Sequence, residues 1–176
     1  QTMLERLLVT LRPLVAETVV IRGIGQTLPR ISQELKAWIK VGRDAEEGRG
    51  PLQGIADALP LLSLEVDKVF LLTCDLPYLT AEWLQTLRDI MTDEYDIVCT
   101  EEDNITNPLL ALYRRPVLES APQLLAAGKR RPLLLWEGWR LARLSAPEET
   151  PWICRDANTP EEFQEAQTYF QTKFND

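Results

Sequence analysis

The chain of 176 residues is 45% hydrophobic and 26% charged, which allows a sizeable core and favours one domain over residues 1–176. Its formal net charge of −8 argues against general binding to nucleic acid or to an anionic membrane, because both require a positive field. The absence of histidine removes Ser-His-Asp and Cys-His catalysis and leaves carboxylate, lysine, arginine or metal chemistry.

The first part of the chain predicts helices and a strand in alternation. Leucines at helical spacing over 4–14 predict a helix that closes near Pro13. A strand is expected over 18–24, a short helix around 32–38 and another helix over 55–62.

The rest of the chain continues this alternation, with strands over 69–74, 96–100, 109–113 and 141–144 and helices over 80–91, over 117–127 and from 160 onward. Thr80 and Thr159 stand where helix caps are expected, and Gly128 stands where a helix ends. This order predicts an α/β domain with helices over a mostly parallel sheet.

The three cysteines, Cys74, Cys99 and Cys154, form no close pair in the sequence. An odd number without such a pair indicates a reducing compartment and no disulfide framework, so we expect a cytoplasmic protein. We find neither an apolar stretch long enough to span a bilayer nor a signal peptide pattern, so we expect no membrane partner and no export.

Asp75 is the strongest candidate for a site residue. It follows the apolar run 69–74, which predicts a strand buried on both faces of a parallel sheet. Ligands collect at the carboxyl ends of such strands, and Mg²⁺ prefers one or two carboxylates together with substrate phosphates. We therefore expect Asp75 to hold Mg²⁺ beside a nucleotide. The alternative is an Asp-x-Pro turn, in which the side chain bonds only local backbone.

A glycine-containing segment before the helix expected over 55–62 is a second candidate. Gly50-Pro51-Leu52-Gln53-Gly54 lets backbone approach a ligand, and the helix start offers free N–H groups to an anion or base. The alternative is an ordinary turn.

Two later patterns contribute polar residues. Asn107 opens the run NPLLALY, and Arg130 and Arg131 end the basic segment GKRR. These cations can hold a phosphate or simply remain solvated at a helix end. Asp156 and Asn158 precede the last helix, whose sequence TPEE forms a capping box. Capping does not exclude contact of either side chain with a metal or ligand.

The ordered series GPLQGI, CDLPYL, NPLLALY, GKRR and NTPEEF resembles that of the molybdenum cofactor guanylyltransferase family, within the nucleotide-sugar-type nucleotidyltransferases. Each motif is modest, whereas their order and spacing together are specific. The resemblance implies a Rossmann-like three-layer α/β/α fold and transfer of GMP from GTP to molybdenum-bearing molybdopterin, with Mg²⁺ and release of pyrophosphate. It also implies molybdoenzymes or cofactor-insertion proteins as partners.

The resemblance assigns roles to individual residues. Asp75 corresponds to the family's magnesium aspartate and is therefore the expected catalytic residue, with Asp156 as a second metal contact. The nucleotide contacts that it implies are Arg22, Asp44, Gly50, Pro51, Leu52, Gly54 and Asp75, and the pterin contacts are Asn107, Arg130, Arg131 and Asn158. Arg22 stands where many members have an asparagine that faces the guanosine, and Asp156 where an asparagine is more usual.

Members of this family open with a strand and a glycine-rich loop of the type LAGGxSxRMGxDK, and nothing of that kind precedes Gln1. We therefore expect residues 1–176 to lack the first strand and the triphosphate-binding loop of the domain, and to be inactive alone. Loss of the central strand would also expose two strand edges.

Three other functions remain open at this point. A related enzyme would use CTP or a sugar phosphate acceptor, because the fold fixes neither base nor acceptor. A non-catalytic paralogue would bind nucleotide or cofactor without turnover. A redox module would use Cys74, although core packing better explains a cysteine in a buried strand without a partner cysteine.

Overall fold

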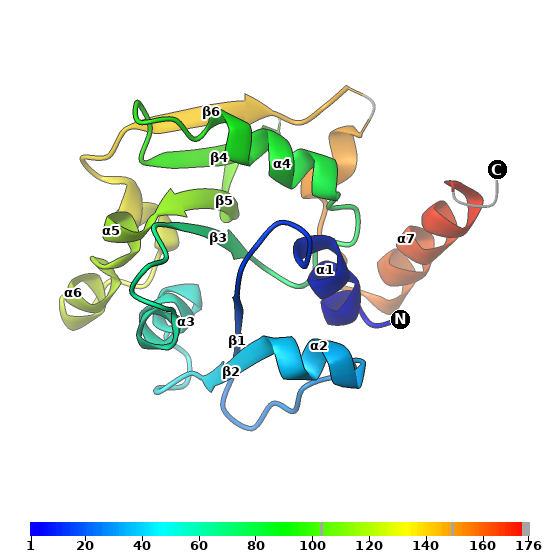
Figure 1. Cartoon of the computed structure of the whole chain (residues 1–176), viewed down its shortest axis with the longest axis horizontal. Helices are drawn as coiled ribbons and strands as arrows, with labels where there is room; N and C mark the ends of the chain where they lie inside the picture. Colours follow the sequence, from blue (N-terminus) through cyan, green and yellow to red (C-terminus); the bar gives the residue numbers. More distant parts are fainter. Residues whose placement is uncertain (103, 149, 174–176) are drawn as a thin grey trace.

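The structure is a computed structural model that describes residues 1–102, 104–148 and 150–173. The helices are α1 (Met3–Leu11), α2 (Gln33–Trp38), α3 (Pro51–Ala58), α4 (Ala81–Ile90), α5 (Arg115–Leu118), α6 (Ala121–Ala126) and α7 (Pro160–Lys173). The strands are β1 (Thr18–Arg22), β2 (Ile39–Arg43), β3 (Lys68–Leu72), β4 (Ile97–Glu102), β5 (Ile105–Arg114) and β6 (Leu141–Ser145). Short 3₁₀ helices cover Leu59–Leu61, Pro132–Trp136 and Pro151–Cys154. This mixture of helices and strands confirms the α/β class (Figure 1).

Hydroxyl side chains begin helices α1, α2 and α4. Thr2, Ser32 and Thr80 each accept a hydrogen bond of 3.2 Å from the backbone N–H three residues further on. Each bond satisfies one of the N–H groups that the start of a helix leaves without a partner. Helix α3 begins differently, because Gly50 precedes it and provides no side-chain bond.

Within the described residues the strands form two sheets. Strands β1 and β2 pair in parallel, with Thr18 opposite Ile39. The larger sheet has the order β3-β5-β4-β6, in which β6 is parallel to β4 and β5 is antiparallel to both of its neighbours. Strand β4 ends at Glu102 and β5 begins at Ile105, so their connection is too short for the crossover that a parallel pair requires.

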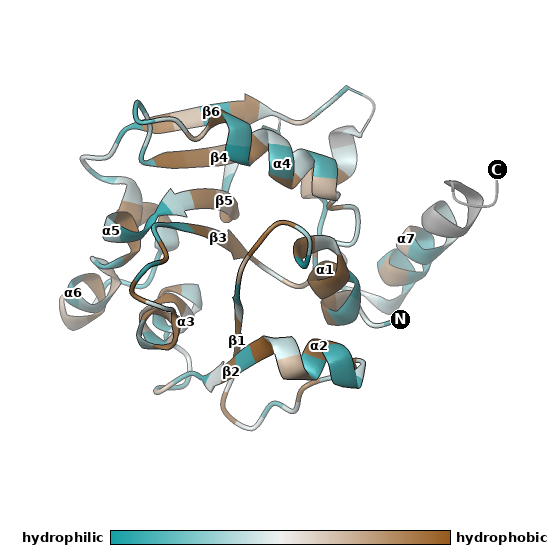
Figure 2. Ribbon diagram, in the orientation of Figure 1, coloured by the Kyte–Doolittle hydropathy of each residue, from teal (hydrophilic) through white to brown (hydrophobic). Residues whose placement is uncertain are grey.

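The larger sheet is covered by helices on both faces. Val98 and Leu112 belong to a core that includes side chains of α1 and α4. Their chain neighbours Ile97 and Ala111 belong to a second core, with side chains of α3, α5 and α6. Because successive strand residues point to opposite faces, these two cores lie on opposite sides of one sheet. Figure 2 shows the mostly hydrophobic colouring of β4, which lies inside this sheet.

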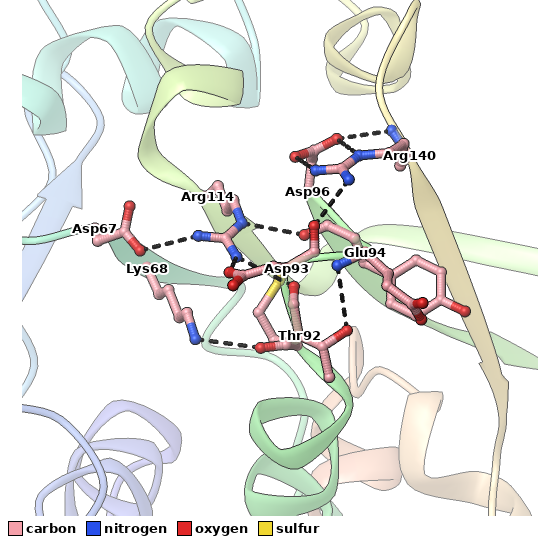
Figure 3. Close-up of polar contacts among 10 residues, drawn as sticks. Asp67, Lys68, Thr92, Asp93, Glu94, Asp96, Arg114 and Arg140 are labelled. Atoms are coloured by element: carbon pink, nitrogen blue, oxygen red, sulfur yellow. Dashed lines mark hydrogen bonds and ion pairs between the residues drawn. The ribbon is translucent and has the colours of Figure 1, made fainter.

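Ion pairs connect residues at the end of the sheet where β3, β4 and β6 begin (Figure 3). Arg114, the last residue of β5, bonds Asp67 at 3.2 Å and Asp93 at 2.7 Å. Arg140 donates two hydrogen bonds to the Asp96 carboxylate, from Nε at 2.8 Å and from Nη2 at 2.7 Å. Asp67 and Asp96 stand directly before β3 and β4, so this network lies at the opposite end of the sheet from the carboxyl end of β3.

Three details differ from the expectation. Strand β2 was not predicted, because its sequence IKVGR combines a glycine with two basic residues. The helix expected over 117–127 is divided into α5 and α6, and Pro122 stands in the first turn of α6, where its missing N–H is tolerated. Strand β3 ends at Leu72, so Cys74 lies beyond it and is exposed. No helix in the described ranges has both the length and the apolar character needed to cross a membrane.

Candidate active site

Asp75 lies in the turn between β3 and α4, at the carboxyl end of β3. Its backbone carbonyl accepts a hydrogen bond from Ala157 N at 2.9 Å. Its side-chain oxygen Oδ1 is buried and has no hydrogen-bond partner among the described residues. A buried carboxylate oxygen without a donor is costly. The arrangement therefore suits a cation, for which such an oxygen is a preferred ligand.

Asp75 lines a cavity of about 1070 Å³ that is also lined by every residue of β1 and of β3. Five of the six other residues expected to contact the nucleotide line the same cavity, namely Arg22, Asp44, Gly50, Pro51 and Gly54. Arg22 ends β1, and its carbonyl oxygen accepts a hydrogen bond from Asp44 N at 3.0 Å. The Arg22 guanidinium donates to the carbonyl oxygen of Gln26, so part of its hydrogen-bonding capacity is used within its own loop.

A second carboxylate, Asp57 of α3, lies near Asp44 but does not line the cavity. Asp57 Oδ2 accepts hydrogen bonds from Ala45 N at 2.7 Å and from Gln53 Nε2 at 2.9 Å, which fixes the turn after Asp44 against α3. Loss of solvation and the charge of Asp57 raise the pKa of Asp44. Sequence reasoning missed Asp57, although the four-residue spacing from Gln53 along α3 is a detectable signal.

Gly50 gives α3 an uncapped start. Its φ of 69° lies in the region that favours glycine. The Leu52 side chain is fully buried in the core. Of Leu52, only the backbone N–H can therefore make the predicted contact with a nucleotide. Gly54 lies against Asp44, because a Cβ added there would meet Asp44 Oδ1 at 3.5 Å. This corner combines N–H donors with a carboxylate acceptor, a set that suits the edge of a nucleobase.

The basic segment approaches the glycine segment from another part of the fold. Arg130 Nη1 donates to the carbonyl oxygen of Gly48 at 3.3 Å, and the carbonyl oxygen of Arg130 lies 3.8 Å from where a Cβ on Gly50 would be. The exposed side chains of Arg130 and Arg131 do not line the cavity. They stand beside the start of α3, where they are available to an anion at the surface.

Asn107, Asp156 and Asn158 lie around the turn that carries Asp75. Thr73 N donates to the Leu109 carbonyl oxygen at 3.3 Å, which places the adjoining NPLL segment at the carboxyl end of β3. The Asn107 side chain accepts from Leu109 N at 2.8 Å, so it is hydrogen-bonded to the backbone of its own strand, β5.

The segment before α7 approaches Asp75 through Ala157 and carries a small polar network. Asn158 Nδ2 donates to Asp156 Oδ2 at 2.9 Å, and Glu162 accepts from the backbone N–H of Asn158 and of Thr159. The described residues contain no group of three or more His, Cys, Asp or Glu side chains placed to hold a metal ion. A metal ion held at Asp75 or Asp156 would therefore need ligands beyond these carboxylates.

The geometry gives Cys74 little chemical reactivity. Desolvation and the neighbouring Asp75 carboxylate raise the pKa of the Cys74 thiol. Its thiolate is therefore scarce near neutral pH, which weakens the redox hypothesis.

Comparisons with known proteins agree on the family. Residues 1–143 match the family described as "MobA-like NTP transferase domain". A "Probable molybdenum cofactor guanylyltransferase" from Geobacillus sp. (strain WCH70) is 29% identical over 124 residues, which cover 69% of this chain and 62% of the relative. A relative with the same name from Bacillus cytotoxicus is 25% identical over 170 residues, which cover 95% of this chain and 83% of the relative.

A solved structure shows the same fold. The molybdopterin-guanine dinucleotide biosynthesis protein A from Archaeoglobus fulgidus superposes with a TM-score of 0.69 at 19% sequence identity, over 98% of this chain and 87% of that chain. This likeness confirms the Rossmann-like α/β fold of nucleotidyltransferases. With a family match over residues 1–143 and this fold, the chain belongs to the MobA-like NTP transferase family.

Proposed function

We propose that the protein transfers GMP from GTP to molybdenum-bearing molybdopterin, forming the guanine dinucleotide form of the cofactor and releasing pyrophosphate. The observation that supports this most is the buried, unpartnered Oδ1 of Asp75 in a cavity shared with Asp44 and Gly50. The names of the relatives from Geobacillus and Bacillus support the choice of substrates.

The Asp75 carboxylate fits Mg²⁺ as the cofactor. A hard cation takes carboxylate oxygens, and Mg²⁺ in nucleotide enzymes uses one or two of them beside phosphate oxygens. Asp156 is the proposed second contact, because Ala157 hydrogen-bonds to the backbone of Asp75. When bound, the ion would neutralise phosphate charge during transfer.

The transfer itself needs no nucleophile from the protein. A phosphate oxygen of molybdopterin forms a bond to the α-phosphorus of GTP, and the bond from that phosphorus to the bridging oxygen breaks as pyrophosphate leaves. The second pKa of a phosphate monoester is about 6, so the acceptor is already largely ionised near neutral pH. The protein then contributes by positioning both substrates and by stabilising the negative charge on the phosphates during transfer.

Asp44 is proposed to recognise the guanine base through its carboxylate. Guanine carries N–H donors on its ring and on its exocyclic amine, which one carboxylate can accept together, whereas cytosine offers a single exocyclic amine on that edge. Arg130 and Arg131 are the proposed contacts to the pterin phosphate, and Asn107 and Asn158 are proposed as further pterin contacts. This arrangement favours GTP over CTP.

The direct test mixes the complete protein encoded by the gene with GTP, Mg²⁺ and molybdenum-loaded molybdopterin, and measures guanine dinucleotide and pyrophosphate together. Product from GTP and not from CTP would support the proposal. A sugar phosphate that served equally well as acceptor would identify a different transferase. Tight nucleotide binding without any product would identify a non-catalytic paralogue.

A further inference from the structure

Asp44 lies between two backbone amides that are both anchored to other parts of the fold. Its own N–H donates to the Arg22 carbonyl oxygen at 3.0 Å, directly after the last paired residues of β1 and β2. The N–H of the next residue, Ala45, donates to Asp57 Oδ2 of α3 at 2.7 Å. Because the peptide groups on both sides of its Cα are held, the direction in which the Asp44 side chain leaves the backbone is restricted.

The Asp57 carboxylate is fixed by its own helix. Gln53 stands four residues earlier in α3, is buried, and donates from Nε2 to the same Oδ2 atom at 2.9 Å. Helical residues four positions apart are neighbours on one face, so α3 holds this carboxylate beside the loop that follows β2. Gly54 leaves room for Asp44, since a Cβ added to this glycine would lie 3.5 Å from Asp44 Oδ1. One helix therefore supports both the backbone and the side chain of the Asp44 region.

The same helix carries the second part of the proposed nucleotide site. Its uncapped start after Gly50 offers backbone N–H groups, whereas Asp44 offers a carboxylate from the end of β2. These two parts belong to different segments of the chain, and the bond from Ala45 N to Asp57 joins them. A base held by both parts requires that their separation stays constant.

We propose that Asp57 is a positioning residue for guanine recognition, which holds the loop after β2 against α3 so that the Asp44 carboxylate faces the base. This inference rests on the proposed function, in which Asp44 accepts the ring N–H and the exocyclic amine of guanine. Asp57 does not line the cavity, so it acts through Ala45 and Asp44 and not on the substrate.

The charges around Asp44 make the recognition sensitive to pH. Burial raises the pKa of Asp44, and the charge of Asp57 raises it further. Arg49 pairs with Glu46 at 2.5 Å, and the guanidinium groups of Arg22 and Arg130 donate to backbone carbonyl oxygens. The ionisable residues on the segments around Asp44 are, besides Asp57, Arg22, Arg43, Glu46, Glu47, Arg49 and Arg130.

The direction of the pH effect follows from the chemistry of the carboxylate. Only the ionised Asp44 can accept both N–H groups of guanine, so the affinity for GTP should fall as the pH falls through the pKa of Asp44. Asp57→Asn removes the neighbouring charge but keeps the contacts, because its oxygen can accept from Ala45 N and the Gln53 amide can rotate to accept from its amide. GTP binding by this variant should then persist to a lower pH than in the parent protein.

Calorimetric titration of the complete protein encoded by the gene with GTP and with ITP, each with Mg²⁺, tests the positioning role. Hypoxanthine, the base of ITP, lacks the exocyclic amine and makes only one of the two bonds to Asp44. Asp57→Ala should weaken GTP binding by about 10-fold and ITP binding by less, so the preference for GTP falls. In an Asp44→Asn background the same substitution should leave the preference unchanged.

Glu5→Ala is the matched control. Glu5 Oε1 accepts a hydrogen bond from Ser32 N at 2.9 Å, so it also joins a helix to a distant backbone amide, but it does not line the cavity. This variant should retain the parent's preference for GTP over ITP. Thermal unfolding compares the folding of all variants, and Asp57→Asn supplies the test if Asp57→Ala does not fold.

Four outcomes overturn the inference. Asp57→Ala could weaken GTP and ITP binding equally, or change the preference in the Asp44→Asn background as much as in the parent. Asp57→Asn could leave the pH dependence of GTP binding where it is, or the parent could bind GTP no better than ITP. A protein that binds GTP selectively and forms no dinucleotide would contradict the proposed function alone. Dinucleotide formation together with an unaltered preference in Asp57→Ala would contradict this inference alone.

Discussion

The backbone N–H of Ala157 donates to the backbone carbonyl of Asp75 at 2.9 Å, and this bond joins the turn before α7 to the turn after β3. Asp156 and Asn158 flank the donor, so one contact brings three polar residues of the candidate site to the same place.

Replacing Asp75 by Asn should lower kcat/KM for dinucleotide formation by about 10³-fold, because a metal ligand supplies several kcal/mol to the transition state. Isothermal titration with Mn²⁺ should show weaker metal binding in the same variant. Asp89→Asn is the control, since Asp89 is an exposed residue of α4 bonded to Gln85. Unchanged activity in Asp75→Asn would refute the metal assignment.

Asp96 should make folding sensitive to acid. Hydrogen bonds from Arg140 lower the pKa of Asp96 from 3.8 to about 2. A depressed pKa in the folded state contributes stability above the unfolded value, and that contribution disappears as the pH falls from 3.8 towards 2. Asp96→Asn should therefore lose roughly 1–3 kcal/mol at pH 7 and converge with the parent protein near pH 2 in urea unfolding.

The matched control is Asp93→Asn. Asp93 also pairs with an arginine, Arg114, but its side chain is fully exposed, and exposed pairs contribute at most about 1 kcal/mol. If both variants lost the same stability at pH 7, burial would not explain the strength of the Asp96 pair.

Tyr113 should stabilise the first half of β5, which contains Asn107. Its hydroxyl donates to the Pro108 carbonyl oxygen at 2.8 Å and accepts from Trp136 Nε1 at 2.9 Å, in a residue with no exposed surface. Tyr113→Phe leaves both partners without this oxygen and should cost roughly 1–3 kcal/mol in chemical denaturation. Thr86→Val on an exposed helix surface should change stability by less than about 0.5 kcal/mol.

The two glycines around the start of α3 should respond in opposite directions. Gly50 has a φ of 69° and a ψ of −170°, a combination that is essentially restricted to glycine, so Gly50→Ala should destabilise the fold by about 1–3 kcal/mol. Gly54 lies inside the helix, and an added Cβ would make ordinary contacts of 3.5 Å with Asp44 and Ile21. Gly54→Ala should thus stabilise the fold by about 0.5–1 kcal/mol. Thermal unfolding of both variants checks the pair, and equal shifts would contradict it.

The three thiols should react in a fixed order with a disulfide reagent under native conditions. Cys74 is exposed, Cys154 is partly buried and Cys99 has no exposed surface. Cys74 should react first, and its rate should rise with pH because its pKa lies above the ordinary value. Burial raises the pKa of Cys99 to about 11, so Cys99 should react only on unfolding. Rapid reaction of Cys74 at pH 6 would instead indicate an activated thiol.

The sequence predicted the features that depend on local chemistry. Thr80 caps α4 as expected, and the strand before Asp75 was found because apolar residues without polar alternation are unusual outside a sheet. Strand β2 was missed because its five residues show no clear alternation of polar and apolar side chains. The division at Pro122 was missed because the apolar pattern continues across it.

In the candidate site, too, some features were predicted from the sequence and others were not. Ordered motifs led to the prediction of Asp75, Asp44 and the glycines as site residues, and these residues line one cavity. Burial of the Leu52 side chain and the role of Asp57 could not be predicted, because both depend on how α3 packs against segments distant in the sequence.

The bond between Ala157 and Asp75 also has a kinetic consequence. It spans almost half of the chain, and β4, β5 and β6 lie between its two partners in the sequence. Contacts between distant segments form late because loop closure costs entropy. During synthesis on the ribosome, Asp75 emerges long before the turn that fixes it, so binding competence should be among the last properties that the folding chain acquires.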